Sequence, residues 1–252
     1  MQVGTNTNDL PWSFGDDEVL DPEMLGWYRD MARLHLRLWP YLWTYVQRLA
    51  DDGRPIQRPL GLAYPELGVH PSDIYLLGDY LLVAPVVEPG VVVRDVPLPD
   101  GEWVDWWTGE SHTGGQVTAI DAPLERIPLL VRAGAPIALL RSTIDTLSPV
   151  ADPEAVDSFA TDPNPLHVRL APGDGQATIY DGTVLTAQYT DDVLVVTRKA
   201  GAVFDGAVVF EIFGAGDEPT AVSAGTWAWV PDADGTLTLT LPADDEAATI
   251  SW

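Results

Sequence analysis

The chain has 252 residues, and 38 acidic against 13 basic side chains give it a formal net charge of −25. A surface this acidic repels nucleic acid and anionic membranes, which argues against both as partners, and the sequence holds no run of about 18 apolar residues that would predict a membrane span. The lack of cysteine excludes disulfides and thiolate metal sites, whereas 46% apolar residues with 22 glycines and 22 prolines indicate a folded chain rich in turns and short strands.

The N-terminal part predicts a loop followed by a long helix. Residues 1–20 are polar and rich in turn-forming residues. Asp21 and Pro22 then provide a helix start, with the carboxylate as N-cap and the proline at the first helical position. From residue 24 to residue 49, large apolar side chains recur every three or four positions, which is the pattern of an amphipathic helix. So broad an apolar face needs a partner surface that residues 54–252 are not expected to supply, which favours a chain truncated on its N-terminal side.

A proline interrupts this helical pattern. Pro40 has no N–H to donate to the carbonyl of Leu36, so the sequence predicts a kink or short break near Trp39. Gly53 follows two aspartates and suits a left-handed C-cap, which predicts that the helix ends there.

Beyond residue 53 the pattern changes to short β-strands. Apolar runs bounded by Gly, Pro or Asp predict a first set of strands at residues 55–64, 80–87, 91–96, 103–107, 117–120 and 129–132. Strands at this spacing predict a β-sandwich over residues 54–140.

A proline-rich stretch separates these strands from a second set. Residues 141–165 have little periodicity and predict a linker or long loop. After it, strands are predicted at residues 166–170, 177–180, 193–198, 207–213, 227–230, 237–241 and 248–252. Residues 166–252 therefore predict a distal β-domain.

Four segments, in this order and spacing, carry a resemblance to a known family. They are Arg-Pro-Leu at 58–60, Leu-Gly-Asp-Tyr-Leu-Leu-Val-Ala-Pro-Val at 77–86, Pro-Asp-Gly-Glu-Trp-Val-Asp-Trp-Trp-Thr-Gly at 99–109 and Ile-Pro-Leu-Leu-Val-Arg-Ala-Gly-Ala-Pro at 127–136. The chain thereby resembles the C-terminal part of a family 31 glycoside hydrolase, the α-glucosidase and α-xylosidase family. The similarity spans residues 1–140.

The resemblance implies a mainly β fold with a helical N-terminal remnant. Residues 1–53 would be the end of a catalytic (β/α)8 barrel, with the proline-containing helix as its last helix. Residues 54–140 would be a proximal C-terminal β-sandwich, residues 141–165 a linker or long loop, and residues 166–252 a distal β-domain. The Ile-Tyr-Asp-Gly segment at 179–182 is similar to a Tyr-Asp-Asp-Gly turn of the family but lacks one acid.

The resemblance also implies a retaining mechanism on α-linked sugars without a cofactor. The two catalytic aspartates of the family would precede Met1. We therefore expect no catalytic residue in this chain, and we expect the chain alone to have no glycosidase activity. An α-linked oligosaccharide or glycoside would then be bound through the missing barrel. Gln2 and Gly4 lie where many members have Met-Arg-x-His, whose histidine contacts the sugar, so these two loop positions are the candidate substrate-binding residues.

Among the chain's own carboxylates, two are placed beside aromatic or apolar residues. Asp79 follows Gly78 at a strand entry, where a carboxylate commonly accepts hydrogen bonds from turn amides. Asp105 should share one face of a strand with Trp103 and Trp107, opposite Val104 and Trp106. A structural role is favoured over catalysis for both acids.

Other chemistries find little support. His35, His70, His112 and His167 have no metal-ligand spacing, and no Ser-His-Asp arrangement or phosphate-binding loop is predicted. Five tryptophans on predicted strands have rings that suit sugar stacking but more often fill a core: Trp103, Trp106, Trp107, Trp227 and Trp229.

Two non-catalytic alternatives stay open. One is a carbohydrate-binding or scaffolding β-sandwich module. The other is an acidic surface or adhesion domain that needs calcium, for which Asp152, Glu154 and Asp157 supply acids without an EF-hand pattern.

Overall fold

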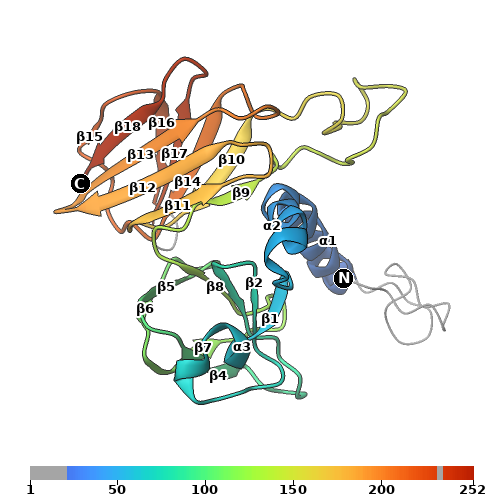
Figure 1. The fold of residues 1–252 in the computed structure, drawn as a ribbon, viewed down its shortest axis with the longest axis vertical. Coiled ribbons are helices and arrows are strands. Elements are labelled where there is room, and N and C mark those ends of the chain that lie inside the picture. Colours follow the sequence, from blue (N-terminus) through green and yellow to red (C-terminus); the bar gives the residue numbers. More distant parts are fainter. Residues whose placement is uncertain (1–21, 232–234) are drawn as a thin grey trace.

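The computed structural model describes residues 22–231 and 235–252. The loop predicted at residues 1–20, the N-cap Asp21 and the candidate residues Gln2 and Gly4 lie outside the described residues. Figure 1 shows two β units, one above the other, with a pair of helices packed beside their junction.

The predicted helix is present and is broken where the proline requires it. Helix α1 spans Pro22–Arg37 and helix α2 spans Trp39–Asp52, with Leu38 between them. Two hydrogen bonds continue across the break, because the N–H of Leu38 donates to the carbonyl of Leu34 and the N–H of Leu42 donates to Leu38, both at 2.9 Å. The prediction of a break near Trp39 is confirmed.

The end of α2 also follows the prediction. Gly53 adopts φ of 68° and its N–H donates to the carbonyl of Leu49 at 3.1 Å. A residue without a side chain adopts this left-handed conformation without steric cost, which is why the helix ends here.

The first β unit, strands β1 to β8, packs a large sheet on a small one. The large sheet has the order β1-β2-β3-β8-β5-β6 and the small one pairs β4 with β7, all antiparallel. The strands are β1 Gln57–Pro59, β2 Tyr75–Leu77, β3 Leu81–Val83, β4 Val93–Leu98, β5 Glu102–Asp105, β6 Ser111–Thr113, β7 Gln116–Asp121 and β8 Leu129–Arg132. A short helix α3, Leu60–Ala63, and a 3-10 helix, Pro65–Leu67, connect β1 to β2. Strands β2 and β6 were not predicted from the sequence.

Both faces of the large sheet are covered. Leu82 and Trp103 pack toward the small sheet, whereas Leu81, Val83 and Val104 pack toward the helices. A strand buried on both faces carries apolar residues without alternation, which explains the apolar residues 81–84, whereas Val86 and Val87, further along the same run, lie outside the strand and are exposed.

The second β unit, strands β9 to β18, is a sandwich of two five-stranded sheets. Their orders are β16-β17-β14-β10-β9 and β11-β12-β13-β18-β15, and the β10–β14 pair is parallel. The strands are β9 Ile137–Leu139, β10 Leu166–Leu170, β11 Gly175–Thr178, β12 Val184–Thr190, β13 Val193–Lys199, β14 Val208–Phe213, β15 Ala221–Val222, β16 Thr226–Val230, β17 Thr236–Leu241 and β18 Ala247–Ser251. Their alternate side chains, such as Leu185, Leu194, Phe210 and Leu239, form one core between the sheets.

The change from one β unit to the other comes earlier than residue 140. Strand β9 pairs with β10, with Ala138 opposite Val168, so its residues belong to the second unit. We therefore place the boundary between the units before Ile137. Residues 141–165 form a long loop outside both sheets, held by Arg141, whose Nε donates to Asp157 Oδ2 at 2.9 Å.

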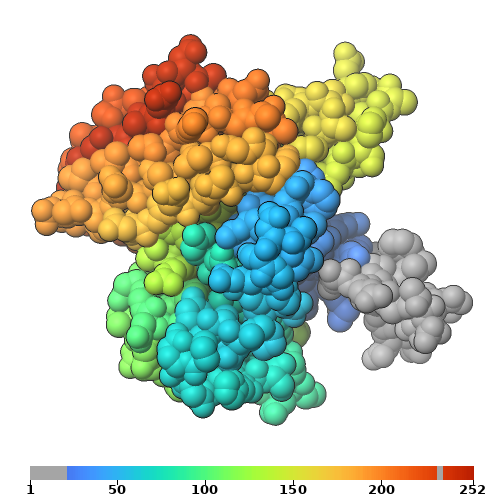
Figure 2. Space-filling model, in the orientation of Figure 1, coloured from blue at the N-terminus to red at the C-terminus, as the bar shows by residue number. Residues whose placement is uncertain are grey.

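The helices bury only part of their apolar surface. Leu38 and Tyr41 are buried against both β units, so residues 54–252 do supply a surface for this part of the helix pair. Met24, Trp43 and Leu49 stay 39%, 37% and 43% exposed. Figure 2 shows α2 lying over the junction of the two β units. The predicted fold class, mainly β with an N-terminal helical segment, is confirmed.

Candidate functional site

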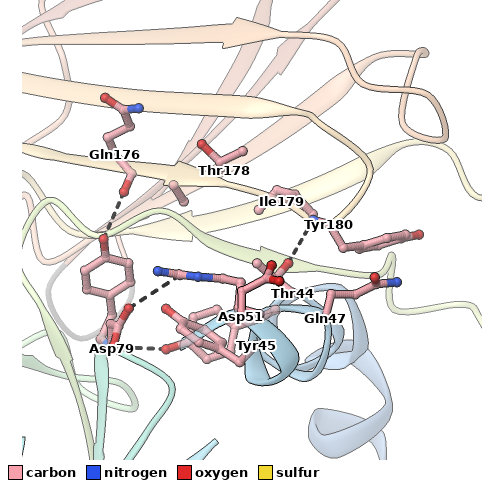
Figure 3. Close-up of a pocket in the computed structure, with 13 residues that line it drawn as sticks. Thr44, Tyr45, Gln47, Asp51, Asp79, Gln176, Thr178, Ile179 and Tyr180 are labelled. Atoms are coloured by element: carbon pink, nitrogen blue, oxygen red, sulfur yellow. Dashed lines mark hydrogen bonds and ion pairs between the residues drawn. The ribbon is translucent and has the colours of Figure 1, made fainter. Parts of the chain in front are cut away.

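The pocket at this junction is the best candidate for a binding site in the described part of the chain. It has a volume of about 590 Å³ and lies between α2, the turn from β2 to β3, and β11 (Figure 3). Helix α2 contributes side chains from Tyr41 to Asp51, the turn contributes Asp79 and Tyr80, and the second β unit contributes residues 176–180. We call it the junction pocket.

The floor of the junction pocket is a buried tyrosine at a tight turn. The hydroxyl of Tyr41 donates to the carbonyl of Leu77 at 2.8 Å and accepts from the N–H of Tyr80 at 3.1 Å. Gly78 has φ of +66°, and a Cβ there would lie 2.3 Å from the Tyr41 hydroxyl oxygen. The close approach of helix and turn therefore requires glycine at this position.

Asp79 sits at one side of the pocket between two arginines. Its Oδ1 accepts a hydrogen bond from Arg58, and its Oδ2 lies 3.6 Å from Nη1 of Arg48. The sequence predicted that this carboxylate would bind turn amides; the structure instead turns it toward the arginines. Arg48 also lies over the ring of Tyr45, 5.3 Å from its centroid.

The tyrosines of the pocket stay neutral. Burial raises the pKa of Tyr45 far above its ordinary value, and the charge of Asp79 raises it further. Burial and then Asp79 also raise the pKa of Tyr80. These phenols therefore act as neutral hydrogen-bonding groups and aromatic surfaces, and not as bases.

Two hydrogen bonds close the pocket from the side of the second β unit. The hydroxyl of Tyr80 donates to the carbonyl of Gln176 at 3.0 Å, and Oγ1 of Thr44 accepts from the N–H of Tyr180 at 3.0 Å (Figure 3). Thr44 in turn donates to the carbonyl of Pro40 at 2.8 Å. The pocket walls thus come from both β units and from α2.

Asp105, the second carboxylate singled out from the sequence, shapes a turn. Its Oδ1 accepts from the N–H groups of Trp107 and Thr108 at 2.8 and 2.9 Å. Trp103 packs in one core, and Val104 and Trp106 pack in the other, as the predicted alternation requires.

The face predicted for Trp107 is wrong. Strand β5 ends at Asp105, so the alternation does not extend to residue 107. The ring of Trp107 instead packs in the same core as Trp106, and its Nε1 donates to the carbonyl of Ile127 at 2.8 Å.

A third carboxylate, which sequence reasoning missed, joins three elements. Glu211 on β14 accepts from Nη2 of Arg37 at 2.8 Å and lies 2.7 Å from Nδ1 of His167, while Arg169 Nη1 lies 3.8 Å from its Oε2. Burial acts to raise the pKa of Glu211, but the hydrogen bond with His167 and the charges of Arg37, His167 and Arg169 lower it to about 2. The available signal was a single acid within the apolar run 208–213.

The remaining candidates from the sequence are dispersed. Among residues 22–231 and 235–252, no group of three or more His, Asp or Glu could hold a metal ion. Asp152 accepts from the N–H groups of Glu154 and Ala155, and Asp157 pairs with Arg141. Trp227 on β16 is 42% exposed. The helices described are also too short or too polar to cross a membrane.

Comparison with known proteins gives a family for the first β unit. Residues 53–137 match the family described as "Glycosyl hydrolase family 31 C-terminal domain". The chain is 36% identical to Alpha-glucosidase 2 of Bacillus thermoamyloliquefaciens over 135 residues, which are 51% of this chain and 16% of that protein. It is 42% identical to 1,3-alpha-isomaltosidase of Kribbella flavida over 130 residues, which are 49% of this chain and 17% of that protein.

Solved structures extend the similarity to the second β unit. A family 31 dextranase of Flavobacterium johnsoniae, crystallised as a mutant with isomaltotriose, matches with a TM-score of 0.76 and 26% identity. The match covers 99% of this chain and 34% of the dextranase chain. A cycloalternan-forming enzyme of Listeria monocytogenes shares the fold at 24% identity with a TM-score of 0.75, over 92% of this chain and 24% of that chain. The chain spans about a sixth of the length of the two curated relatives.

Proposed function

We propose that this chain is the non-catalytic C-terminal part of a retaining hydrolase of α-linked sugars. The premise is that residues 53–137 match the C-terminal domain of glycoside hydrolase family 31. The observation that carries the proposal is the fold similarity to the dextranase over 99% of this chain. The α-glucosidase and isomaltosidase relatives support α-linked sugars as the substrate class.

The environment of the chain's own carboxylates supports a non-catalytic role. A retaining glycosidase needs two carboxyl groups about 5 Å apart, one as nucleophile and one as acid/base. Asp79 is bound by arginines, Asp105 accepts from two turn amides, and Glu211 lies among Arg37, His167 and Arg169. We infer that the catalytic pair belongs to a barrel outside residues 22–252.

The helix pair has the properties of a link between such a barrel and the β units. One shared core contains Leu38 and Tyr41 from the helices, Val131 from β8 and Leu139 from β9. On α2, Trp43 and Leu49 keep 37% and 43% of their surface exposed, which is apolar surface of the kind that a barrel would cover. We assign residues 1–53 to the end of a (β/α)8 barrel, the first β unit to a proximal domain and the second to a distal domain.

Two assays test the proposal. The purified 252-residue chain should release no chromophore from aryl α-glucosides above the buffer rate, because a nucleophile and an acid are lacking. The same chain extended upstream by an in-frame barrel should turn over at least one aryl α-glycoside. Turnover by the 252-residue chain alone contradicts the proposal, and so does an upstream sequence that encodes no barrel.

A carbohydrate-binding role without catalysis is the second candidate. The observation that favours it is the junction pocket, which combines aromatic rings with hydrogen-bonding side chains. This role is compatible with the first and does not require a barrel.

A further inference from the structure

We propose that the junction pocket binds a neutral sugar, one or two pyranose rings in size. The proposal deepens the second candidate function and does not depend on the chain being part of an active hydrolase. It rests on the size of the pocket, the aromatic side chains in its walls, the unpaired polar groups at its rim, and its charge.

The dimensions suit a small ligand. Pockets that hold small molecules commonly have volumes of about 300–1,000 Å³, and the junction pocket has about 590 Å³. Its walls are fixed from three directions by α2, the β2–β3 turn and β11, as Figure 3 shows. The hydrogen bond from Tyr80 to Gln176 spans the pocket and connects the two β units at 3.0 Å.

The aromatic side chains are held in place before any ligand binds. Tyr41 and Tyr45 meet edge to face with ring centroids 4.9 Å apart. Tyr180 meets Trp39 in the same manner at 5.3 Å. Tyr80 is fixed through its hydroxyl, and Tyr45 through Tyr41 and Arg48. Rings that are already ordered lose little conformational entropy on binding. Tyr41 is buried, whereas Tyr45, Tyr80 and Tyr180 are partly exposed, and an aromatic face suits the apolar face of a pyranose.

Hydrogen-bond donors and acceptors both remain available at the rim of the pocket. The side chains of Gln47, Asp51 and Thr178 line the pocket and make no hydrogen bond to any residue of the described chain. Asp51 rises from α2 toward β11 in Figure 3. Arg48 is 50% exposed and adds further donors. An amide, a carboxylate, a hydroxyl and a guanidinium together match the mixed donors and acceptors of a polyol.

The charge of the pocket favours a neutral ligand over an ion. Arg48 and Arg58 both pair with Asp79, and Asp51 supplies a second negative charge, so the charges around the pocket balance. With no net positive charge in the pocket, a phosphate or sulfate would be repelled by the chain's net charge of −25. A metal ion would find Asp79 already paired with Arg48 and Arg58.

Titration of the full 252-residue chain with glucose, maltose and isomaltose tests the proposal, by calorimetry or by ligand-observed NMR. We expect saturable one-site binding with Kd at or below the millimolar range for at least one of these sugars. Glucose 6-phosphate serves as the anionic probe and should bind more weakly than glucose. No saturation by any of the three sugars overturns the proposal, as does tighter binding of the phosphate ester than of glucose.

Matched variants locate the site. Asp51→Trp should fill the pocket from the helix side and weaken sugar binding at least about tenfold, whereas Asp30→Trp, on an exposed position of α1, should leave it unchanged. Arg48→Ala should weaken binding about tenfold, and Arg54→Ala, also exposed, should not.

The outcome of these variants decides the location independently of catalysis. If Asp51→Trp and Arg48→Ala, shown to be folded by circular dichroism, bind the sugar as well as their controls do, the sugar binds elsewhere and the proposal is wrong. The aryl α-glycoside assay tests only the assignment to a hydrolase, and the sugar titrations test only the junction pocket. Failure of one proposal can therefore be distinguished from failure of the other.

Discussion

Arg37 and Glu211 lie 174 positions apart in the chain, yet Nη2 of the arginine is 2.8 Å from Oε1 of the glutamate. The arginine is the last residue of α1 and the glutamate is in the middle of β14. Both side chains are largely buried, and His167 and Arg169 complete the cluster. The helix pair is thereby attached to the second β unit through an ionic contact as well as through apolar packing.

Removing the charge at residue 211 should destabilise the fold. In Glu211→Gln, Arg37, His167 and Arg169 lose the negative charge that they share, although an amide oxygen can still accept a hydrogen bond. Breaking a buried ion pair from one side costs about 3 kcal/mol. We expect the free energy of unfolding in urea to fall by about 2–3 kcal/mol. Glu66→Gln, at an exposed position in the first turn of the 3-10 helix, is the control and should change little. Equal stability of the two variants would contradict the assignment.

The same carboxylate makes stability depend on pH in the acid range. The pKa of Glu211 is about 2 in the folded protein against an ordinary value of 4.5. A carboxyl group whose pKa is lowered by folding stabilises the fold at pH values above its pKa in the unfolded chain. For Glu211 this stabilisation, up to about 3 kcal/mol, is lost as the pH falls from 4.5 toward 2.

Urea titrations of wild type and Glu211→Gln at a series of pH values measure this contribution. The difference in unfolding free energy between them should be constant from pH 7 to about 5.5 and shrink below that. A difference that stays constant down to pH 3 would show that Glu211 titrates normally.

The hydroxyl of Tyr80 should stabilise the contact between the two β units. Tyr80→Phe keeps the ring but removes the donor to the carbonyl of Gln176, and such a loss costs about 1 kcal/mol. Tyr75→Phe is a matched control, because no hydrogen bond of the Tyr75 hydroxyl is found in the described chain. Thermal unfolding should show a lower Tm for Tyr80→Phe only; identical Tm values would mean that this hydrogen bond has no net effect.

Two glycine substitutions separate backbone strain from close packing. Gly78 and Gly90 both have positive φ, +66° and +78°, so alanine at either costs about 1–2 kcal/mol in strain. At Gly78 the new Cβ would also meet the Tyr41 hydroxyl at 2.3 Å, whereas at Gly90 nothing lies within 4 Å. Gly78→Ala should therefore lower the unfolding free energy by about 2 kcal/mol more than Gly90→Ala does. Equal losses would show that the helix yields to the added methyl group.

Substitutions at Asp105 test how its carboxylate stabilises the turn that follows β5. Asp105→Asn retains an oxygen that can accept from the amides of Trp107 and Thr108, so it should cost less than about 1 kcal/mol. Asp105→Ala leaves both amides without this partner and should cost about 1–3 kcal/mol in urea unfolding. A full loss of stability in the asparagine variant would point to a requirement for the negative charge.

Local features of the fold were predictable because they depend on neighbours in the chain. The break before Trp39 follows from one missing N–H at Pro40, and the end of α2 follows from the conformational freedom of Gly53. The alternation of Trp103 and Val104 between two cores follows from the geometry of a strand. The prediction for Trp107 is wrong because a turn, stabilised by Asp105, replaces the strand there.

Features that depend on distant residues were not predictable in this way. The assignment of Ile137–Leu139 to the second β unit depends on pairing with β10, which follows a loop of more than twenty residues. The junction pocket needs three segments that are far apart in sequence, and neither propensity nor periodicity encodes their meeting. The family resemblance supplied the architecture but no information on this pocket.

The backbone of α1 is joined to an edge of the second β unit. The N–H of Leu140 donates to the carbonyl of Arg37 at 2.7 Å, and Nε of Arg37 donates back to the carbonyl of Leu140 at 3.0 Å. Strand β9 is the terminal strand of its sheet, and an open terminal strand invites pairing with another molecule. The helix shields that end, so any intermolecular sheet extension of this five-stranded layer would have to start at the opposite strand, β16, where Trp227 lies exposed.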